Sequence, residues 1–110
     1  MTKYWVFLAV AIIAEVAATS ALKLSDGMTK WMPTFFVIAG YSVAFYCLAQ
    51  AIQAIPVGIS YAVWAGVGIV LVALIGWLVF GQKLDAAAMV GIAFIIIGVV
   101  LITLVSKSVK

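Results

Sequence analysis

Glu15 is the residue of this 110-residue chain best suited to carry chemistry, because it interrupts a long apolar segment. It is the twelfth residue of the stretch 4–22, so a helix there would place its carboxyl group near the middle of a membrane. An acidic side chain at that depth costs about 2.5 to 3.5 kcal/mol even on permissive scales. A carboxyl group that gains and loses a proton there is typical of a proton-coupled site. The alternative is a permanently protonated glutamate that donates a hydrogen bond to a neighbouring helix.

The residues that would share a helical face with Glu15 are small or aliphatic, apart from one threonine. On a helix, positions three or four residues away lie on the same side and can line a ligand site together with the carboxyl group. Small side chains also let membrane helices approach closely, so ordinary packing explains this face equally well. The candidates for contact with a ligand are Leu8, Ala11, Ile12, Ala18 and Thr19.

Two aromatic residues in the third apolar segment could complement the charge of Glu15. Tyr61 and Trp64 are three residues apart on one face, and aromatic rings attract organic cations by about 0.5 to 2 kcal/mol. A carboxylate beside such rings forms a site for an organic cation. The alternative is an interfacial belt of aromatic residues, but both lie deeper in the segment than a belt requires. In the second segment, Tyr41 fits either role.

Glycines in the third and fourth apolar segments indicate movement or close packing. Gly66 and Gly68 weaken the middle of one helix, which predicts a hinge or, equally, a close contact with a neighbouring helix. In the fourth segment Gly91 and Gly98 are seven residues apart and so share a face. That face predicts an oligomerisation seam, whose residues are Gly91, Ile95, Gly98 and Ile102.

The composition requires a lipid environment. Hydrophobic residues make up 69% of the chain and charged residues only 8%, whereas soluble domains are about half apolar and a quarter charged. A core this small could not bury such an excess. With no histidine and one cysteine, the chain lacks the ligands for zinc or haem, so we expect no metal and no cofactor. Its six basic residues, all lysine, are too scattered to bind nucleic acid.

Polar breaks divide the apolar sequence into four segments, each with roughly 28 to 36 Å of helix and so long enough to cross a membrane. Pro56 separates the second from the third, because proline lacks a backbone N–H and disfavours helix at the preceding residue. Gly81 ends the third, and Asp85 is suited to cap the fourth. An N-terminal signal peptide is the alternative for the first, but its removal would discard Glu15. The predicted all-α membrane domain covers residues 1–110, with spans at 4–22, 32–55, 57–80 and 86–105.

The lysines give no net signal for orientation in the membrane. Four spans put Lys3, Lys107 and Lys110 on one side, and Lys23, Lys30 and Lys83 on the other. Orientation follows the excess of lysine and arginine in short loops, so three against three predicts insertion both ways up. The alternative is that one lysine at a critical helix end decides the orientation alone.

Three motifs together resemble the small multidrug resistance transporter family. They are Ala14-Glu15-Val16, IPVGISYAVWAGVG over residues 55–68, and FGQKLD over residues 80–85. The resemblance covers the whole chain in length, number of spans and order of motifs. It implies an antiparallel homodimer of four-helix subunits that exchanges protons for lipophilic cations across a bacterial inner membrane, and no enzymatic activity. The chain has Ala17-Ala18 where the guanidinium branch has a tryptophan, so it is more similar to the branch that exports quaternary-ammonium and polyaromatic cations.

The resemblance also implies roles for individual residues. Glu15 would bind both protons and substrate, Tyr61 and Trp64 would line the site with Tyr41, and the glycine face of the fourth span would form the dimer seam. A guanidinium or other small-cation exporter, a proton channel, and a non-transporting membrane subunit are the alternatives. Some positions differ from the best-known members and bear on the substrate range: Trp5 replaces a tyrosine, Ala18 a glycine, Ala44 and Ala65 serines, and Tyr46 a tryptophan.

Overall fold

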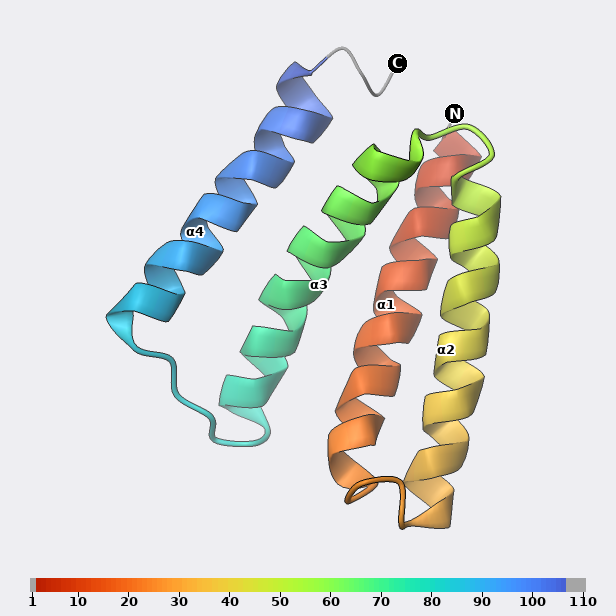
Figure 1. The fold of residues 1–110 in the computed structure, drawn as a ribbon, viewed down its shortest axis with the longest axis vertical. Helices are drawn as coiled ribbons and strands as arrows, with labels where there is room; N and C mark the ends of the chain where they lie inside the picture. Colours follow the sequence, from red (N-terminus) through yellow and green to blue (C-terminus); the bar gives the residue numbers. More distant parts are fainter. Residues whose placement is uncertain (1, 107–110) are drawn as a thin grey trace.

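The computed structural model describes residues 2–106, which contain four long helices and no strand (Figure 1). The elements are α1 (Thr2–Leu24), α2 (Trp31–Ala51), α3 (Val57–Leu78), α4 (Ala86–Val100) and η1 (Leu101–Val105), a π-helical turn that prolongs α4. All four helical segments are long and apolar enough to cross a membrane, so the predicted four-span fold is confirmed. Two of the lysines expected on the terminal side, Lys107 and Lys110, lie outside the described residues.

The helix ends differ from the predicted spans by a few residues, for local reasons. α1 extends two residues beyond the predicted limits at each end. α2 stops at Ala51 rather than at Ile55, because the chain turns ahead of Pro56. The N–H groups of Gln53 and Ala54 donate only three residues back, to the carbonyl groups of Gln50 and Ala51 at 3.2 and 3.3 Å. α3 ends at Leu78, and the chain then adopts a left-handed conformation at Gly81, with φ of +68°.

Side-chain hydrogen bonds fix the two loops at the lower end of the molecule in Figure 1. In the first loop the buried Ser25 Oγ donates to the Leu22 carbonyl group at 2.7 Å and accepts from the Met28 N–H at 3.0 Å. In the second loop the Asp85 carboxylate accepts from the Ala88 N–H at 2.9 Å. The predicted cap of the fourth span is therefore confirmed.

The helices lie side by side in a flat layer, in the order α4, α3, α1, α2 across Figure 1. The shortest dimension of the backbone is 16 Å, little more than the diameter of about 10–12 Å of one helix. α1 and α2 approach closely at Gly40, where an added methyl group would lie 2.8 Å from the Ala18 Cβ. α4 packs on α3, where Val99 and Ile95 cover Gly66.

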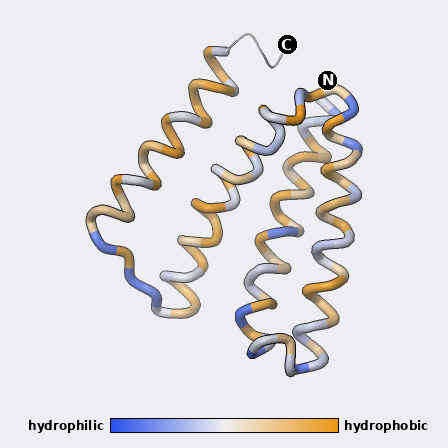
Figure 2. The backbone as a smooth tube through the Cα atoms, in the orientation of Figure 1, coloured by the Kyte–Doolittle hydropathy of each residue, from blue (hydrophilic) through white to orange (hydrophobic). Residues whose placement is uncertain are grey.

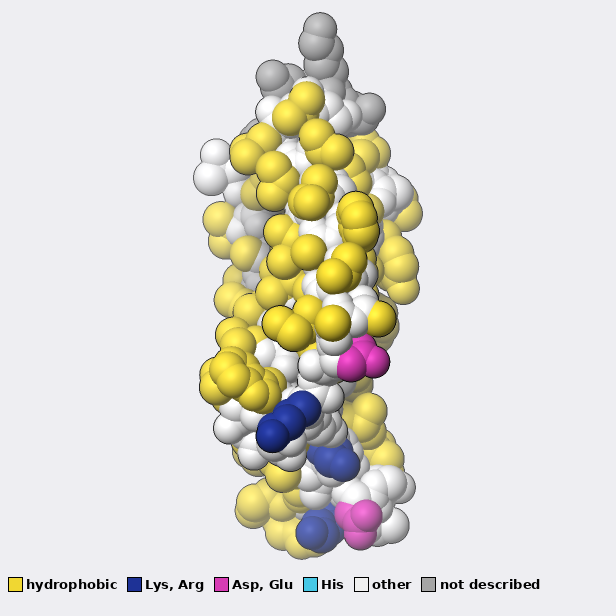
Figure 3. Space-filling model, turned by 90° about the vertical axis from the view of Figure 1, so that its left-hand side faces the viewer, with side chains coloured by type: hydrophobic (Ala, Val, Ile, Leu, Met, Phe, Trp, Pro, Cys, Tyr) yellow, Lys and Arg dark blue, Asp and Glu magenta, His cyan; other side chains and the backbone are white. Residues whose placement is uncertain are grey.

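The buried core lies between α1, α2 and α3. Leu8, Ile12 and Val16 of α1 pack there with Val63 and Trp64 of α3. By contrast, α4 has no buried residue. Figure 2 shows hydrophobic residues along most of α4, and Figure 3 shows apolar side chains covering the face that α4 presents, above a group of lysines. The chain therefore leaves extensive apolar surface that lipid or a second protein chain could cover.

Candidate functional site

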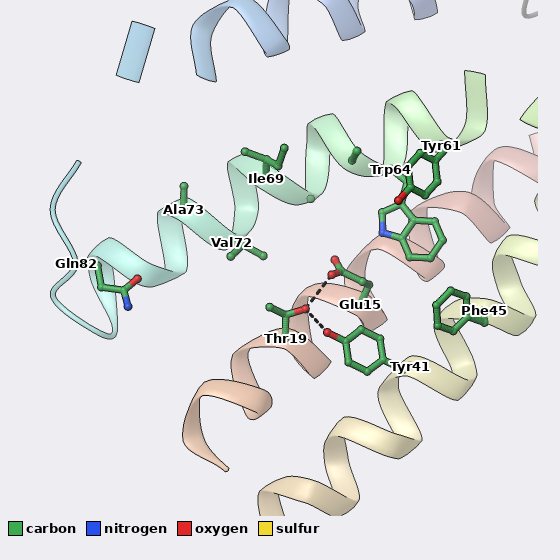
Figure 4. Close-up of a pocket in the computed structure, with 12 residues that line it drawn as sticks. Glu15, Thr19, Tyr41, Phe45, Tyr61, Trp64, Ile69, Val72, Ala73 and Gln82 are labelled. Carbon is green, nitrogen blue, oxygen red and sulfur yellow. Dashed lines mark hydrogen bonds between the residues drawn. The ribbon is translucent and has the colours of Figure 1, made fainter. Parts of the chain in front are cut away.

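The Glu15 side chain lines a cavity of about 590 Å³ between α1, α2 and α3 (Figure 4). α1 and α2 contribute two residues each, and α3 contributes most of the remaining wall. The lining is largely apolar and aromatic, with polar side chains near Glu15 and at Gln82, which reaches the cavity from the loop after α3. The lining residues are Glu15, Thr19, Tyr41, Phe45, Tyr61, Trp64, Ala65, Gly68, Ile69, Val72, Ala73 and Gln82.

Thr19 and Tyr41 form a hydrogen-bonded chain that ends on the Glu15 carboxyl group. The Thr19 Oγ1 donates to Glu15 Oε1 at 2.8 Å and lies 2.7 Å from the Tyr41 hydroxyl oxygen. A threonine hydroxyl has one proton to donate. When Thr19 donates to Glu15, Tyr41 must therefore donate to Thr19. The chain joins α1 to α2 and holds the carboxyl group in one orientation, as Figure 4 shows.

The second oxygen of the carboxyl group is free to meet a ligand. Among the described residues, Glu15 Oε2 has no hydrogen-bond partner. It lies beside Gly68 of α3, where an added methyl group would be 3.4 Å away, so the glycine leaves space next to the oxygen. Within residues 2–106 Glu15 is the only carboxyl group that lines this cavity, and no cluster of His, Cys, Asp and Glu suited to a metal ion occurs.

Four aromatic rings form a continuous row beside Glu15. The ring centroids are 6.3 Å apart for Tyr41 and Phe45, 5.7 Å for Phe45 and Trp64, and 6.1 Å for Trp64 and Tyr61. These distances are typical of aromatic contacts. Trp64 is only 8% exposed, whereas Phe45 is 60% and Tyr61 64% exposed. The buried ring of Trp64 thus lies between two open rings, which can contact the flat or cationic part of a ligand.

The sequence predicts nine residues that contact a proton or ligand, and the structure places only some of them in the cavity. Five of them meet in the cavity: Glu15, Thr19, Tyr41, Tyr61 and Trp64.

The other four, all on α1, do not line this cavity because neighbouring helices cover them. Leu8 and Ile12 belong to the buried core and border a separate apolar hollow of about 360 Å³. Ala18 packs on Gly40 of α2, and Ala11 is fully buried. Helical periodicity placed them on the same side as Glu15, but the packing of α2 and α3 decides which part of that side stays open.

Phe45 and Gln82 also line the cavity, although neither was predicted from the sequence to contact a ligand. Phe45 lies four residues after Tyr41, and this spacing puts the two rings on one helical face. The spacing alone does not distinguish Phe45, because phenylalanine is common in apolar spans. The Gln82 N–H donates to the Gly76 carbonyl group at 2.9 Å. Its side chain lies over Gly76, where an added methyl group would be 2.6 Å from Gln82 Oε1. This contact brings the loop back onto α3.

The two glycines predicted as a hinge lie within a continuous helix, since α3 runs unbroken to Leu78. Gly66 is covered by Val99 of α4, and Gly68 lies against Glu15 and Trp64. Both positions therefore serve close packing in this structure. Hinge motion at these glycines stays a prediction.

The predicted dimer seam on α4 is open at its glycines and partly occupied at its isoleucines. Nothing lies within 4 Å of a methyl group added at Gly91 or Gly98. Ile95 approaches Gly66 of α3, and Ile102 packs against the edge of the core. Space for a partner helix thus exists at the glycine pair, and the seam itself stays a prediction.

Over most of its length the chain is similar to known multidrug-resistance proteins. A family model described as Small Multidrug Resistance protein matches residues 3–96. The chain is 57% identical over 105 residues to the quaternary ammonium compound-resistance protein QacF of Klebsiella aerogenes, and 53% identical over 106 residues to QacE of Escherichia coli. Each alignment covers 96% of both chains. The chain is also 45% identical over 104 residues to the multidrug transporter EmrE of Escherichia coli, with 94% of both chains covered.

Proposed function

Because the chain belongs to the small multidrug resistance family, we propose that its Glu15 cavity binds protons and a lipophilic cation in turn, and that this exchange drives export. The protein is an integral membrane multidrug transporter and not an enzyme. Its relatives are bacterial, and two are named for resistance to quaternary ammonium compounds. Quaternary-ammonium and polyaromatic cations are accordingly its substrate class, and the bacterial inner membrane is its location.

The unpaired state of one Glu15 carboxyl oxygen is the observation that best supports this exchange. Oε2 has no hydrogen-bond partner among the described residues and adjoins a cavity with aromatic walls. A carboxylate in such surroundings is costly unless its charge is neutralised. A proton and a bound cation both neutralise it, so the binding of one opposes the binding of the other. This competition by itself couples the export of a cation to the uptake of protons.

Thr19 and Tyr41 allow the carboxyl group to change state without losing its hydrogen bonds. With Glu15 ionised, Tyr41 donates to Thr19 and Thr19 donates to Oε1. With a proton on Oε1, rotation of the two hydroxyl groups reverses both bonds, since each hydroxyl can donate and accept. Glu15 therefore keeps its position in both states and does not have to be repacked during each cycle.

The lining supports a bulky or flat cation over guanidinium. Tyr61 and Phe45 offer ring faces, which attract cations that have no hydrogen to donate. Guanidinium instead requires several acceptors in one plane. Beyond Glu15 the cavity wall is mainly apolar, and Ala65 contributes only a methyl group. These features support the quaternary-ammonium and polyaromatic branch.

A second copy of the chain completes the site in this proposal. One flat layer leaves Tyr61 and Phe45 exposed, so a partner is required to enclose a drug-sized ligand. Open space at Gly91 and Gly98 suits close approach of a partner helix. The equal lysine numbers on the two sides favour opposite orientations. In an antiparallel dimer, inward-open and outward-open forms become the same structure with the subunits exchanged.

The test is pH-driven uptake of a quaternary ammonium compound and a planar aromatic cation by purified protein in liposomes. Glu15→Gln keeps the size of the side chain but cannot exchange a proton, so uptake should be abolished while size-exclusion chromatography still shows a folded dimer. Asp26→Asn is the matched control, because Asp26 lies in an exposed loop. Substantial uptake by Glu15→Gln would overturn the proposal. Proton flux without substrate would indicate a channel, and strong guanidinium uptake a small-cation exporter.

A further inference from the structure

A second cavity lies between α3, α4 and the loop that joins them, with a volume of about 490 Å³. It shares only Ala73 with the lining of the Glu15 cavity and is otherwise built from residues to which the transport mechanism assigns no role. Seven of its eight lining residues are apolar or aromatic, and the eighth is a lysine. They are Val70, Ala73, Leu74, Trp77, Lys83, Leu84, Met89 and Ile92.

The apolar part of this cavity has the form of a groove along α3. Val70 and Trp77 are seven residues apart, so the groove is about 10 Å long. α4 forms the other wall near its first turns, where Met89 is 62% exposed. A groove of this length, lined by aliphatic side chains inside a membrane, suits part of a lipid acyl chain.

The polar end of the cavity carries an uncompensated positive charge. Lys83 forms no ion pair with any residue that the structure describes. The neighbouring Asp85 is engaged at the start of α4, where it accepts from the Ala88 N–H. Lys23 and Lys30 lie in or beside the other loop at the same end of the molecule, and Figure 3 shows lysine side chains gathered there. Trp77 is 56% exposed beside Lys83, as expected of a ring at the membrane interface.

We propose that this cavity is a binding site for an anionic phospholipid, with an acyl chain in the α3–α4 groove and the phosphate group at Lys83. The lysine complements the charge of the phosphate group at one end, and the apolar side chains complement an acyl chain along the rest of the cavity. Lysine beside a membrane attracts anionic headgroups, and its long side chain can extend from an apolar groove to the headgroup layer. The site is independent of whether Glu15 binds protons and drugs.

Native mass spectrometry of the full chain, equilibrated with equal amounts of phosphatidylglycerol and phosphatidylcholine, tests the assignment. Wild type should retain phosphatidylglycerol preferentially. Lys83→Gln should lower the ratio of the two retained lipids about fivefold, as expected for losing one lysine near an anionic surface. Lys30→Gln removes a lysine at the same end but outside the cavity, so it loses only the diffuse attraction of the membrane surface and should lower the ratio much less.

A second pair of variants tests the groove. Val70→Phe places a ring in the groove and should lower retention of both lipids, whereas Val90→Phe, at an exposed position of α4 that does not line it, should not. Equal effects of Lys83→Gln and Lys30→Gln would show diffuse attraction and overturn the proposal. So would unchanged lipid retention in Val70→Phe. If Val70→Phe instead reduced the dimer fraction at unchanged lipid retention, the groove would be the seat of a second copy.

Discussion

Replacing Gly40 by alanine should separate α1 from α2 and disturb the Glu15 site through that movement. The added methyl group would lie 2.8 Å from the Ala18 Cβ, 3.3 Å from the Ala18 Cα and 3.2 Å from the Ala14 carbonyl oxygen. Carbon atoms in favourable contact are about 3.5–4.0 Å apart. Two of these three atoms belong to the backbone of α1 and cannot rotate away. The helices must therefore move apart at this point by roughly 1 Å.

The movement has an energetic and a functional consequence. Overpacking costs about 1–3 kcal/mol, and alanine regains roughly 1 kcal/mol over glycine inside a helix. The net loss of folding free energy is then up to about 2 kcal/mol. Gly40 precedes Tyr41, and Ala18 precedes Thr19. The same movement should lengthen the 2.7 Å contact between Thr19 and Tyr41 to about 3.5 Å, which is too long for a hydrogen bond. Uptake should fall although no residue of the cavity has changed.

Thermal unfolding in detergent and pH-driven uptake in liposomes measure the two effects. Gly58→Ala is the matched control, because nothing lies within 4 Å of a methyl group added there, so Tm and uptake should not decrease. Adding Ala18→Gly to Gly40→Ala removes the 2.8 Å contact and should restore part of both losses. If Gly40→Ala proves as stable and as active as Gly58→Ala, the inferred close approach of α1 and α2 is refuted.

Four further changes address the aromatic row, a helix cap, the dimer seam and the orientation in the membrane. Phe45→Leu should weaken binding of planar aromatic cations by about 0.5–1.5 kcal/mol, measured by calorimetry; an equal loss for a tetraalkylammonium ion would indicate a packing defect instead. Asp85→Ala should lower the free energy of unfolding by about 1 kcal/mol through loss of the cap, and an unchanged Tm would contradict that role. Gly91→Leu fills the open space at the proposed seam and should reduce the dimer fraction measured by light scattering; an unchanged dimer fraction would show that the seam lies elsewhere. Two or three lysines added to the terminal side should fix one orientation and lower uptake, and co-expression with an oppositely biased partner should restore it; full activity of a single-orientation population would exclude an antiparallel dimer.

The four spans could be predicted because clusters of polar residues mark two of the three loops and Pro56 marks the third. Asp85 could be recognised as a cap from its position ahead of an apolar segment, and the structure shows the expected hydrogen bond. The end of α2 was harder to predict, because residues 52–55 are as apolar as the helix before them. Only the influence of Pro56 on the preceding backbone distinguishes that turn. The internal hydrogen bonds of Ser25 likewise depend on a loop shape that composition does not reveal.

Site residues whose type is rare in a membrane span could be predicted from the sequence, whereas residues of common type could not. Glu15 and Trp64 stood out because an acidic residue and an aromatic residue deep in apolar spans both require an explanation. Phe45 belongs to the same row of rings, but phenylalanine is common in any apolar span. Leu8 shares a helical face with Glu15, yet neighbouring helices cover it. Periodicity gives the direction of a side chain on its own helix, and only the packing of the other helices decides whether that direction is open.

The contact of α4 with α3 gives the proposed dimer seam a short mechanical connection to the proposed proton site at Glu15. Val99 of α4 covers Gly66, and Gly68, two residues further along the same helix, lies against the Glu15 carboxyl group. A partner that displaces α4 would therefore shift the wall of the cavity directly, without moving α1 or α2. Val99→Ala should loosen this connection, slowing the interchange of subunit conformations seen by NMR line shapes at unchanged substrate affinity. An unchanged interchange rate would show that the two subunits communicate through other contacts.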